Sequence, residues 1–551
     1  MKFRKKDFLL WGVVLLLALV FRLYKLSSIP YGFHVDEAKA GWNAYSMLKT
    51  GMDDKGNFLP LYYDSFGDFR PTGLLYLIIP SLAIFGPSIF GVRFSIALIG
   101  SLTIFPLMFI LNEMFKKNKI IGGIGAFLVS FNPWHIIASR STSESVVSIF
   151  FSLWGIYFLL KTFRNKNFKN VIYSLFFFSI SYFFYHNIRV LAPLFVLSII
   201  LVKKLLNKQS NKYFYSWLIF AGITIATVVF MSSGEARGRL SQVGLKSDFR
   251  VLDEVTNMPI EAGPNNVFMA RMFHNKIASY IRIFLEEYRE YFSTGFLIGS
   301  SYKPNRYFVP QIGLFTYIEF VLFMCGVVFL SKSKKILFVV LLLLLSPLPA
   351  AITIEDTPNM QRAIFMIPFM IIIMAFGFSN LSNIQNKFKF LKNLIIFLYF
   401  ANFIYFWHMY LVHQKMSIAS YYRDGGNVEL VKKLSEVNSS YEKIYLTNTP
   451  DSLYPWLGLL LDKDPKMFNA GVHSDMSSES KYENFIFTSD KCPLNSYLNS
   501  GSQNFESILF VDSEGCEDDK EFTDVVNINT VDVIYRPDGS PPYVLKSVSK
   551  I

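Results

Sequence analysis

Two adjacent carboxylates shortly after the first apolar segment are the strongest candidates for chemistry in this chain. They are Asp36 and Glu37, and His34 precedes them. A carboxylate beside a reacting group can accept a proton from it. The alternative is structural, because acidic residues in the first turn of a helix also stabilise that helix by capping and by charge. The residue types alone leave both alternatives open.

Three arginines lie in the connections that flank apolar segments, namely Arg70, Arg140 and Arg189. For Arg189 we expect a polar partner inside the protein, because a charge that faces lipid is costly. Snorkelling of its guanidinium to lipid headgroups is the alternative. Arg140 precedes Glu144 by four residues, so on a continuous helix the two would share a face and could simply pair with one another.

The two carboxylates must be held by the segment that follows them. Val35, Ala38, Trp42 and Tyr45 recur at helical spacing, and Gly51 is a typical residue for the end of a helix. This pattern predicts an amphipathic helix that carries both carboxylates in its first turn. We expect the helix to lie in the membrane interface with its aromatic face toward lipid.

Composition places the chain among membrane proteins. Of its 551 residues, 52% are hydrophobic and only 17% are charged, so a large part of the surface must face lipid. The formal charge of +13 comes from short basic clusters and forms no nucleic-acid motif, so no nucleic-acid partner is expected. The basic and apolar start resembles a signal peptide, but Arg22 follows without a small-residue cleavage site, which predicts a retained first span.

Eleven segments are predicted to cross the membrane, since a spanning helix needs roughly 20 apolar residues. The fold class is therefore an α-helical polytopic membrane protein. The predicted spans are approximately 8–26, 88–114, 120–138, 145–162, 168–187, 188–206, 213–232, 311–330, 336–353, 361–380 and 393–412.

Basic residues alternate between the connections of these spans. Every second connection holds three or four Lys or Arg, while the short connections between them hold one arginine each. The positive-inside rule then predicts a multi-pass protein of the plasma (inner) membrane with a cytoplasmic amino terminus. The basic connections are at 116–119, 161–169, 203–212, 332–335 and 387–392, and the polar segments at about 27–87, 233–310 and from 413 onward fall outside.

The last polar segment is predicted to be a small soluble α/β domain, residues 413–551, beside a transmembrane module of residues 1–412. Its 13 Lys and Arg against 21 Asp and Glu give −8, which leaves +21 for the rest of the chain. If it is extracytoplasmic, Cys492 and Cys516 can form a disulfide, whereas Cys325 lies in an apolar run. We expect a helix at Glu429–Val437 and strands at Lys443–Leu446, Asn484–Phe487, Ser507–Val511 and Val531–Tyr535.

The order of these features resembles the GT-C glycosyltransferases related to protein O-mannosyltransferases and lipid A aminoarabinose transferases. An acidic pair follows the first span, an acidic-basic-proline step precedes the second span, and a Gly-Val-Arg-Phe sequence lies at the start of the second span. The segments FNPWHIIASRSTSE at 131–144 and YFFYHNIRVLAP at 182–193 are similar to the second and third outer loops of the family. The resemblance covers roughly residues 1–380.

The resemblance implies a membrane glycosyltransferase that moves a sugar from a polyprenyl-phosphate donor to a hydroxyl acceptor on the extracytoplasmic face. Asp36 matches the catalytic carboxylate of the family, and Glu37 is its neighbour. A carboxylate that takes the acceptor's proton lowers the barrier. Inversion of configuration at the sugar is part of this expectation. The developing phosphate charge needs cations, for which the resemblance suggests Arg70, Arg140 and Arg189. Further substrate or acidic-site candidates are His34, Asp68, Glu144, Tyr185 and His186.

The cofactor and the acceptor stay open at this point. A divalent cation held by Asp36, Asp68, His34 and Glu144 would help to neutralise the phosphate, but the sequence contains no tight ligand spacing. The acceptor can be a protein, a lipid or a glycan. The alternatives to a transferase of this kind are a lipid-linked glycan polymerase or ligase, and a polytopic lipid or sugar transporter.

Overall fold

The chain forms two compact units. The first comprises Met1–Tyr24 and Ile96–Tyr410, and the second comprises Lys25–Ser95 and Leu411–Ile551. The second unit therefore joins the predicted carboxyl-terminal domain with the whole of the polar segment predicted at 27–87. The computed structural model describes residues 5–116, 118, 120–164, 167–206, 214–231, 244, 248–329, 337–384, 389–447, 452–472, 479–500, 506–516 and 526–550. All or part of each predicted basic connection, and residues 233–243 and 245–247 of the segment at 233–310, lie outside this range.

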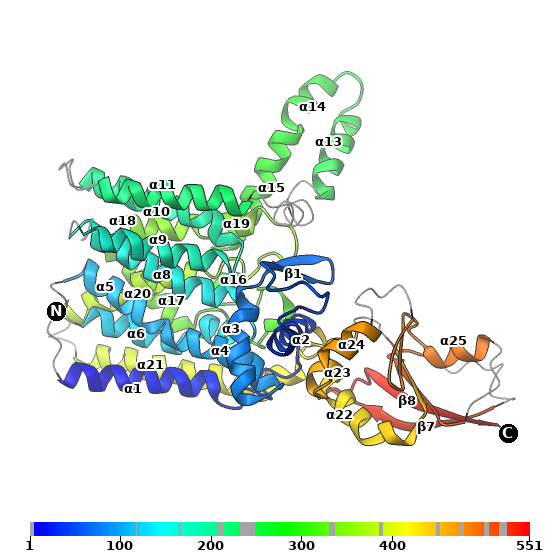
Figure 1. Ribbon diagram of the computed structural model, residues 1–551. Helices are drawn as coiled ribbons and strands as arrows, with labels where there is room; N and C mark the ends of the chain where they lie inside the picture. Colours follow the sequence, from blue (N-terminus) through cyan, green and yellow to red (C-terminus); the bar gives the residue numbers. More distant parts are fainter. Residues whose placement is uncertain are drawn as a thin grey trace. The chain divides into compact units, whose positions relative to one another are not determined.

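Apolar helices that run alongside one another build the first unit (Figure 1). Two of them approach closely at Gly326 and Gly377, where a Cβ atom would collide with the backbone of the facing helix. The helices are α1 (Lys5–Leu23), α4 (Ile89–Leu102, which begins in the second unit), α5 (Ile104–Met114), α6 (Ile121–Phe131), α7 (Pro133–Ser139), α8 (Glu144–Thr162), α9 (Phe168–Tyr182), α10 (Asn187–Leu206), α11 (Phe214–Met231), α17 (Tyr317–Val328), α18 (Leu337–Leu345), α19 (Leu348–Ala351), α20 (Met366–Ile384) and α21 (Lys389–His408).

Each of the eleven predicted spans contains at least one of these helices. By length and composition, four helical segments in the described residues can cross a membrane, and a fifth is possible if the pair α6–α7, bent by 58°, counts as one. Further apolar helices of 10–17 residues include Gly73–Phe85, in a region predicted to be polar. The four segments are Ile89–Met114, Glu144–Thr162, Phe214–Met231 and Phe390–Met416.

Shorter helices fill the connection between α11 and α17. Among them α13 and α15 form a hairpin, with α14 at its tip (Figure 1). Their bounds are α13 (Phe249–Glu261), α14 (Val267–Phe273), α15 (Lys276–Glu290), α16 (Thr294–Leu297) and the 3-10 turn η3 (Asn305–Tyr307).

The second unit begins with helix α2 (Val35–Thr50), the antiparallel pair β1 (Tyr62–Ser65) and β2 (Asp68–Pro71), and helix α3 (Gly73–Phe85). After α21 the chain passes through a π-helical turn η7 (Met409–His413) and 3-10 turns η8 (Gln414–Met416) and η9 (Tyr421–Arg423). The helices that follow are α22 (Asn427–Val437), which the 3-10 turn η10 (Asn438–Ser440) extends, α23 (Tyr454–Leu460), α24 (Pro465–Gly471) and α25 (Pro493–Asn499).

A six-stranded sheet in the order β4-β5-β3-β6-β8-β7 is the centre of the carboxyl-terminal segment. Strand β3 runs parallel to both β5 and β6, and the other pairs are antiparallel. This confirms a small sheet domain. The strands are β3 (Lys443–Thr447), β4 (Ser480–Tyr482), β5 (Phe485–Thr488), β6 (Ile508–Ser513), β7 (Val526–Ile534) and β8 (Tyr543–Lys550).

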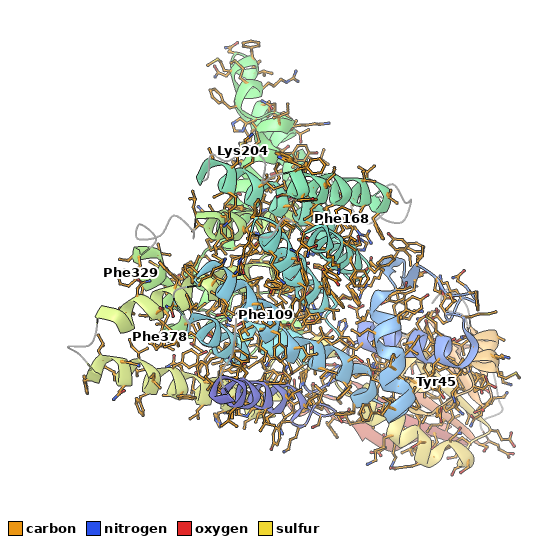
Figure 2. All side chains as sticks on the ribbon, turned by 60° about the vertical axis from the view of Figure 1, so that its left-hand side comes forward. Tyr45, Phe109, Phe168, Lys204, Phe329 and Phe378 are labelled. Carbon is orange, nitrogen blue, oxygen red and sulfur yellow. A yellow bond between two sulfur atoms is a disulfide. The ribbon has the colours of Figure 1, made fainter. Side chains whose placement is uncertain are left out.

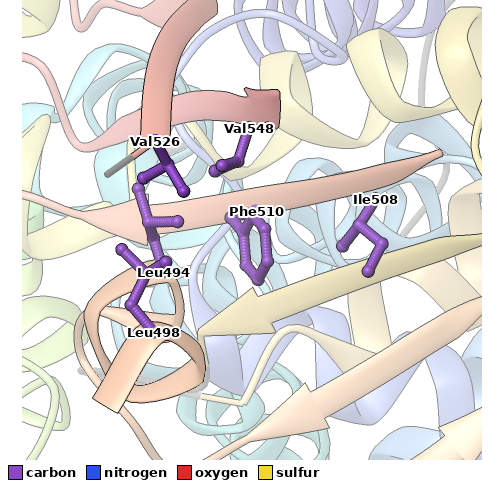
Figure 3. Close-up of a cluster of buried hydrophobic side chains, with 6 residues drawn as sticks. All are labelled: Leu494, Leu498, Ile508, Phe510, Val526 and Val548. Atoms are coloured by element: carbon purple, nitrogen blue, oxygen red, sulfur yellow. The ribbon is translucent and has the colours of Figure 1, made fainter. Parts of the chain in front are cut away.

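Apolar residues from α25 and from the strands pack together on one part of this sheet. Leu494 and Leu498 of the helix meet Phe510, Val526 and Val548 of three strands (Figure 3). Burial of such side chains stabilises the segment by roughly 1.5–3 kcal/mol each. A disulfide between Cys492 and Cys516 joins the start of α25 to the residues after β6.

Candidate active site

The predicted carboxylates open helix α2, whose N-cap residue is His34. The Asp36 amide donates to His34 Nδ1 at 3.1 Å, and the His34 amide donates to Glu37 Oε2 at 3.3 Å. At the other end Gly51 takes a left-handed conformation, φ +75°, as its position predicts. The capping role considered for the acidic pair is therefore filled by Glu37 together with His34, and the Asp36 side chain takes no part in it.

Glu37 is enclosed by two arginines from distant parts of the sequence. Arg93 donates to Glu37 Oε1 at 3.2 Å and to Oε2 at 2.8 Å, and Arg423 donates to Oε2 at 2.6 Å. A buried carboxylate requires such partners, because desolvation of an isolated charge is expensive. The side chain of Glu37 is 5% exposed and that of Asp36 is 22% exposed, so of the two carboxylates only Asp36 is open to a reactant.

The same arginines fix the loop before α2. Arg93 donates to the carbonyl oxygens of Pro30 and Gly32 at 3.1 and 2.6 Å, while Arg423 donates to that of Tyr31 at 3.1 Å. Gly32 has φ +80°, and a Cβ atom there would collide with the main chain of Arg423. Only glycine therefore allows the carboxyl-terminal segment to come this close to the loop.

Two consecutive residues of the carboxyl-terminal segment, Arg423 and Asp424, bind the residues on either side of Asp36. The Val35 amide donates to Asp424 Oδ2 at 2.6 Å, next to the bond between Arg423 and Glu37. Asp36 thus lies between two anchored positions, which restricts where its carboxylate can point.

Asp36 itself forms an ion pair with Arg70 on strand β2. Arg70 Nη2 lies 3.0 Å from Asp36 Oδ1, and Arg70 Nε donates to Asp68 Oδ2 at 2.9 Å. His34 Nδ1 is 3.5 Å from Asp36 Oδ2. The structure therefore brings together four of the residues that were predicted from the sequence, and all four side chains are partly exposed.

A cation is already present between the two aspartates, because the guanidinium of Arg70 contacts both of them. Among the described residues, no three His, Cys, Asp or Glu side chains gather as metal ligands would. The arrangement supports a site in which an arginine supplies the positive charge.

The aromatic face of α2 was expected to contact lipid, and this expectation is wrong. Trp42 and Tyr45 are buried against the carboxyl-terminal segment, where Trp42 Nε1 donates to Asn469 Oδ1 at 3.0 Å and the hydroxyl of Tyr45 bonds to Asp462. The Asp462 bond and burial raise the pKa of Tyr45. An apolar stripe shows that a helix face is covered, but it does not show whether lipid or protein covers it.

A buried polar cluster also joins α2 to α23. Lys39 bonds to both Asp54 and Tyr454, and its ammonium lies 4.9 Å from the centre of the Phe66 ring. Burial and the nearby Asp54 carboxylate raise the pKa of Tyr454 well above its usual value. The helix that carries Asp36 is thus fixed along its whole length.

The remaining predicted cations belong to the first unit. Arg189 is fully buried; it lies 3.1 Å from His186 Nδ1 and donates to the Tyr182 carbonyl oxygen at 3.1 Å. The expected interior partner is therefore present, and Arg189 does not snorkel to the surface. Tyr185 and His186 occupy the turn between α9 and α10.

Arg140 and Glu144 do not lie on one helix, contrary to the premise that they share a helix face. Arg140 ends α7, and Glu144 begins α8 after a turn. Arg140 donates to the carbonyl oxygens of Phe21 and Tyr24 at 2.8 and 2.7 Å, and its guanidinium lies over the Tyr410 ring at 5.5 Å. It caps the end of α1, where carbonyl groups lack helical partners.

Sequence reasoning gave no role to Arg22, Arg93 or Arg423, all of which are fully or almost fully buried. Arg22 donates to Ser139 Oγ at 3.1 Å and to Val129 O at 3.1 Å. A charge within or beside an apolar run was the available signal for Arg22 and Arg93. Arg423 had no such signal, since its partner Glu37 lies 386 residues away in the chain.

Comparisons with known proteins agree with this architecture. Residues 70–232 match the family described as dolichyl-phosphate-mannose-protein mannosyltransferase. No curated protein sequence matches the chain. The fold is similar to that of ArnT from Cupriavidus metallidurans in the apo state, with a TM-score of 0.52 and 10% identity, over 98% of each chain.

A second similar structure is the oligosaccharyltransferase of Archaeoglobus fulgidus in complex with Zn and sulfate. Its TM-score is 0.50 at 11% identity, over 97% of this chain and 72% of that chain. At these identities the likeness concerns the fold. The resemblance to GT-C glycosyltransferases, predicted from the order of motifs, is confirmed.

Proposed function

We propose that this membrane protein, with its GT-C glycosyltransferase fold, transfers a sugar from a polyprenyl-phosphate donor to a hydroxyl acceptor on the extracytoplasmic face. The observation that carries the proposal is the partly exposed Asp36 carboxylate, 3.0 Å from Arg70 and anchored on both sides. The family matched by residues 70–232 is named for a lipid-phosphate sugar donor, which supports this class of donor.

In the proposed reaction the acceptor oxygen attacks the anomeric carbon from the face opposite the lipid phosphate. Its proton passes to Asp36 as the new carbon–oxygen bond forms. The bond between the anomeric carbon and the phosphate oxygen breaks, and both of its electrons leave with the lipid phosphate. The products are the glycosylated acceptor with inverted configuration, the lipid phosphate and a proton on Asp36, which is then lost to water.

The leaving phosphate gains charge as this bond breaks, so a nearby cation lowers the barrier. We assign this role first to Arg70, because its side chain is 17% exposed and a guanidinium can hold phosphate oxygens while it remains bonded to Asp36. Arg140 and Arg189 are kept as further candidates, although both are fully buried. Neither has a surface that a phosphate could reach without movement of the protein.

The other predicted site residues receive positioning roles. Glu37 orients the start of α2 through its arginines, and His34 and Asp68 orient Asp36 and Arg70. For Glu144, Tyr185 and His186 we keep the predicted place near the substrate or acidic site. No step of the reaction is assigned to a metal ion.

The proposed orientation puts the amino terminus in the cytoplasm and the carboxyl-terminal segment outside, with eleven spans. Positive-inside asymmetry in the sequence supports it. The disulfide between Cys492 and Cys516 gives independent support, because such bonds persist in oxidising compartments and are rare in the cytosol.

Replacement of Asp36 by Asn tests the proposal most directly. The purified protein is incubated with a panel of polyprenyl-phosphate sugars, and release of lipid phosphate is measured with and without candidate acceptors. We expect Asp36→Asn to lower turnover on the order of 100-fold or more, which is the usual contribution of a general base.

The matched control is Glu483→Gln, which removes a carboxylate from an exposed position in the same unit. It should leave turnover unchanged. Near-normal turnover by a folded Asp36→Asn variant would refute the assigned role, and failure of the wild type to consume any lipid-linked donor would refute the transferase itself.

A further inference from the structure

The hairpin of α13 and α15 exposes large apolar side chains and buries two glutamates, Glu254 and Glu287. Large apolar side chains point outward from it, among them Phe268, 78% exposed, and Ile277, 73% exposed. On α15 the exposed Ile277, Ile281 and Leu285 recur every four residues and form one stripe along the helix.

The charged residues pair between the helices. Arg282 lies 2.5 Å from Glu254, and Arg250 lies 2.8 Å from Glu287. His274 Nδ1 also lies 3.2 Å from Glu254 Oε1. Carboxylates that are buried against cations of the facing helix hold the hairpin together, and apolar residues that could have filled this interface are left outside. Contiguous apolar surface of this kind marks a contact with lipid or with another protein.

The direction of the hairpin favours lipid over another protein as the contact. In Figure 1 it projects sideways from the helices of the first unit and runs across their direction, at the end where α11 finishes. In Figure 2 it also stands out from these helices. Since α11 is long and apolar enough to cross a membrane, a segment that runs across it at its end lies along the membrane surface. The hydroxyl of Tyr288 donates to Leu344 O at 2.7 Å and fixes the base of the hairpin to α18.

Charge agrees with a lipid surface. Residues 262–281, at the tip and the start of α15, include Arg271 and Lys276 and no acidic residue. Arg271 and Lys276 are exposed beside the apolar side chains of α14. Helices that lie in the membrane interface combine apolar and basic residues in this way, with the apolar side chains between the acyl chains and the cations among the phosphates.

We infer that α13–α15 forms an arm seated in the headgroup region of the bilayer that the first unit crosses. Its apolar stripes contact acyl chains, and its basic tip contacts lipid phosphates. In the proposed orientation this is the outer leaflet, but the contact with lipid does not depend on the role of Asp36. Such an arm would hold the adjoining end of the bundle at a constant depth in the membrane.

The test is a measurement of depth by site-directed spin labelling in the full-length protein. Cys325→Ser removes the free thiol, and the disulfide-bonded cysteines do not react. Single cysteines replace Ile260, Phe268 or Ile277, all highly exposed, so folding should be unaffected. The variants are reconstituted in vesicles of phosphatidylcholine and phosphatidylglycerol, and collision with oxygen and with a water-soluble nickel complex is measured by power saturation.

Two control positions calibrate the result. Val228 on α11, 63% exposed, represents a side chain that faces acyl chains, and Glu514, whose side chain is 47% exposed, represents water. We expect all three hairpin labels to favour oxygen over nickel, as Val228 does. Nickel accessibility equal to that of Glu514 would overturn the inference. Spin–spin broadening that grows with the protein-to-lipid ratio would assign the apolar stripes to a second copy, and would overturn it as well.

Discussion

Arg423→Ala changes the anchoring of α2 without altering the proposed base. The variant loses one charge-assisted hydrogen bond to Glu37, 2.6 Å long, and one bond to the Tyr31 carbonyl oxygen. Both bonds have an ionised guanidinium as donor, and hydrogen bonds to charged groups contribute about 1.5–3 kcal/mol each. Glu37 keeps both bonds from Arg93, so it does not become an unpaired buried charge. The second unit should therefore lose about 3–6 kcal/mol of stability.

The effect on catalysis should be larger than the loss of stability suggests. Val35 and Glu37, which flank Asp36, are each held from the carboxyl-terminal segment, and a displacement of 1 Å in a catalytic group can cost about 100-fold in rate. We expect Arg423→Ala to lower kcat by roughly 10- to 100-fold, with little change in the KM for the donor. Lipid-phosphate release gives kcat and KM, and thermal unfolding followed by tryptophan fluorescence gives stability.

Two further variants make this result interpretable. Arg423→Lys keeps the charge but cannot donate to Glu37 and Tyr31 with the same geometry, so it should restore turnover in part. Lys433→Ala removes a cation that pairs with Asp532 on the surface of the same unit and should change neither quantity, since exposed pairs contribute about 0–1 kcal/mol. Unchanged kcat in Arg423→Ala, despite a lower melting temperature, would show that Arg423 stabilises the fold but does not position the base.

A double-mutant cycle between Arg423 and Glu37 checks the contact itself. Combined with Glu37→Gln, Arg423→Ala should show a coupling energy of about 1.5–3 kcal/mol. Additive effects would contradict the ion pair on which this reasoning depends.

The remaining predictions concern the phosphate and the disulfide. Arg70→Ala should raise the KM for the donor more than the KM for the acceptor, because the donor carries the negatively charged phosphate. A larger rise in the KM for the acceptor would contradict the assigned contact between Arg70 and the phosphate. Arg189→Ala is expected to act in the same direction, and unaltered donor affinity in the folded variant would limit Arg189 to a structural role, which includes its contacts with His186 and Tyr182. Cys492→Ser removes a disulfide between residues 24 positions apart and should lower the stability of the sheet domain by about 3 kcal/mol. Cys325→Ser should leave that stability unchanged. Full reactivity of Cys492 with a thiol reagent in the unreduced protein would contradict the disulfide.

Local patterns predicted what depends on nearby residues. The spacing from Val35 to Tyr45 and the cap at Gly51 located α2, and hydropathy located a helix in each predicted span. The cluster of His34, Asp36, Asp68 and Arg70 was also predictable as a set, since its members come from one short stretch of chain. Regular backbone hydrogen bonding and helix capping are local, so the sequence carries their signal directly.

What the sequence could not predict depends on contacts between distant segments. Nothing near Trp42 indicates that α24 covers it, and nothing near Glu37 indicates Arg423. In the sheet, β8 escaped prediction although β6 and β7 were found in part, because Lys546, Ser547 and Ser549 interrupt its apolar residues. The parallel pairing of β3 with β5 and β6 likewise depends on crossovers that no single strand encodes.

The bond between Val35 and Asp424 joins residues 389 positions apart and has a consequence for biogenesis. A ribosome that has inserted the first helix must add nearly the whole bundle before the segment that secures this loop emerges. Until then Trp42 has no cover and Glu37 lacks one of its two guanidinium partners. During insertion the growing chain would therefore be inactive in the proposed reaction. Activity would arise only after the carboxyl-terminal segment has folded against α2.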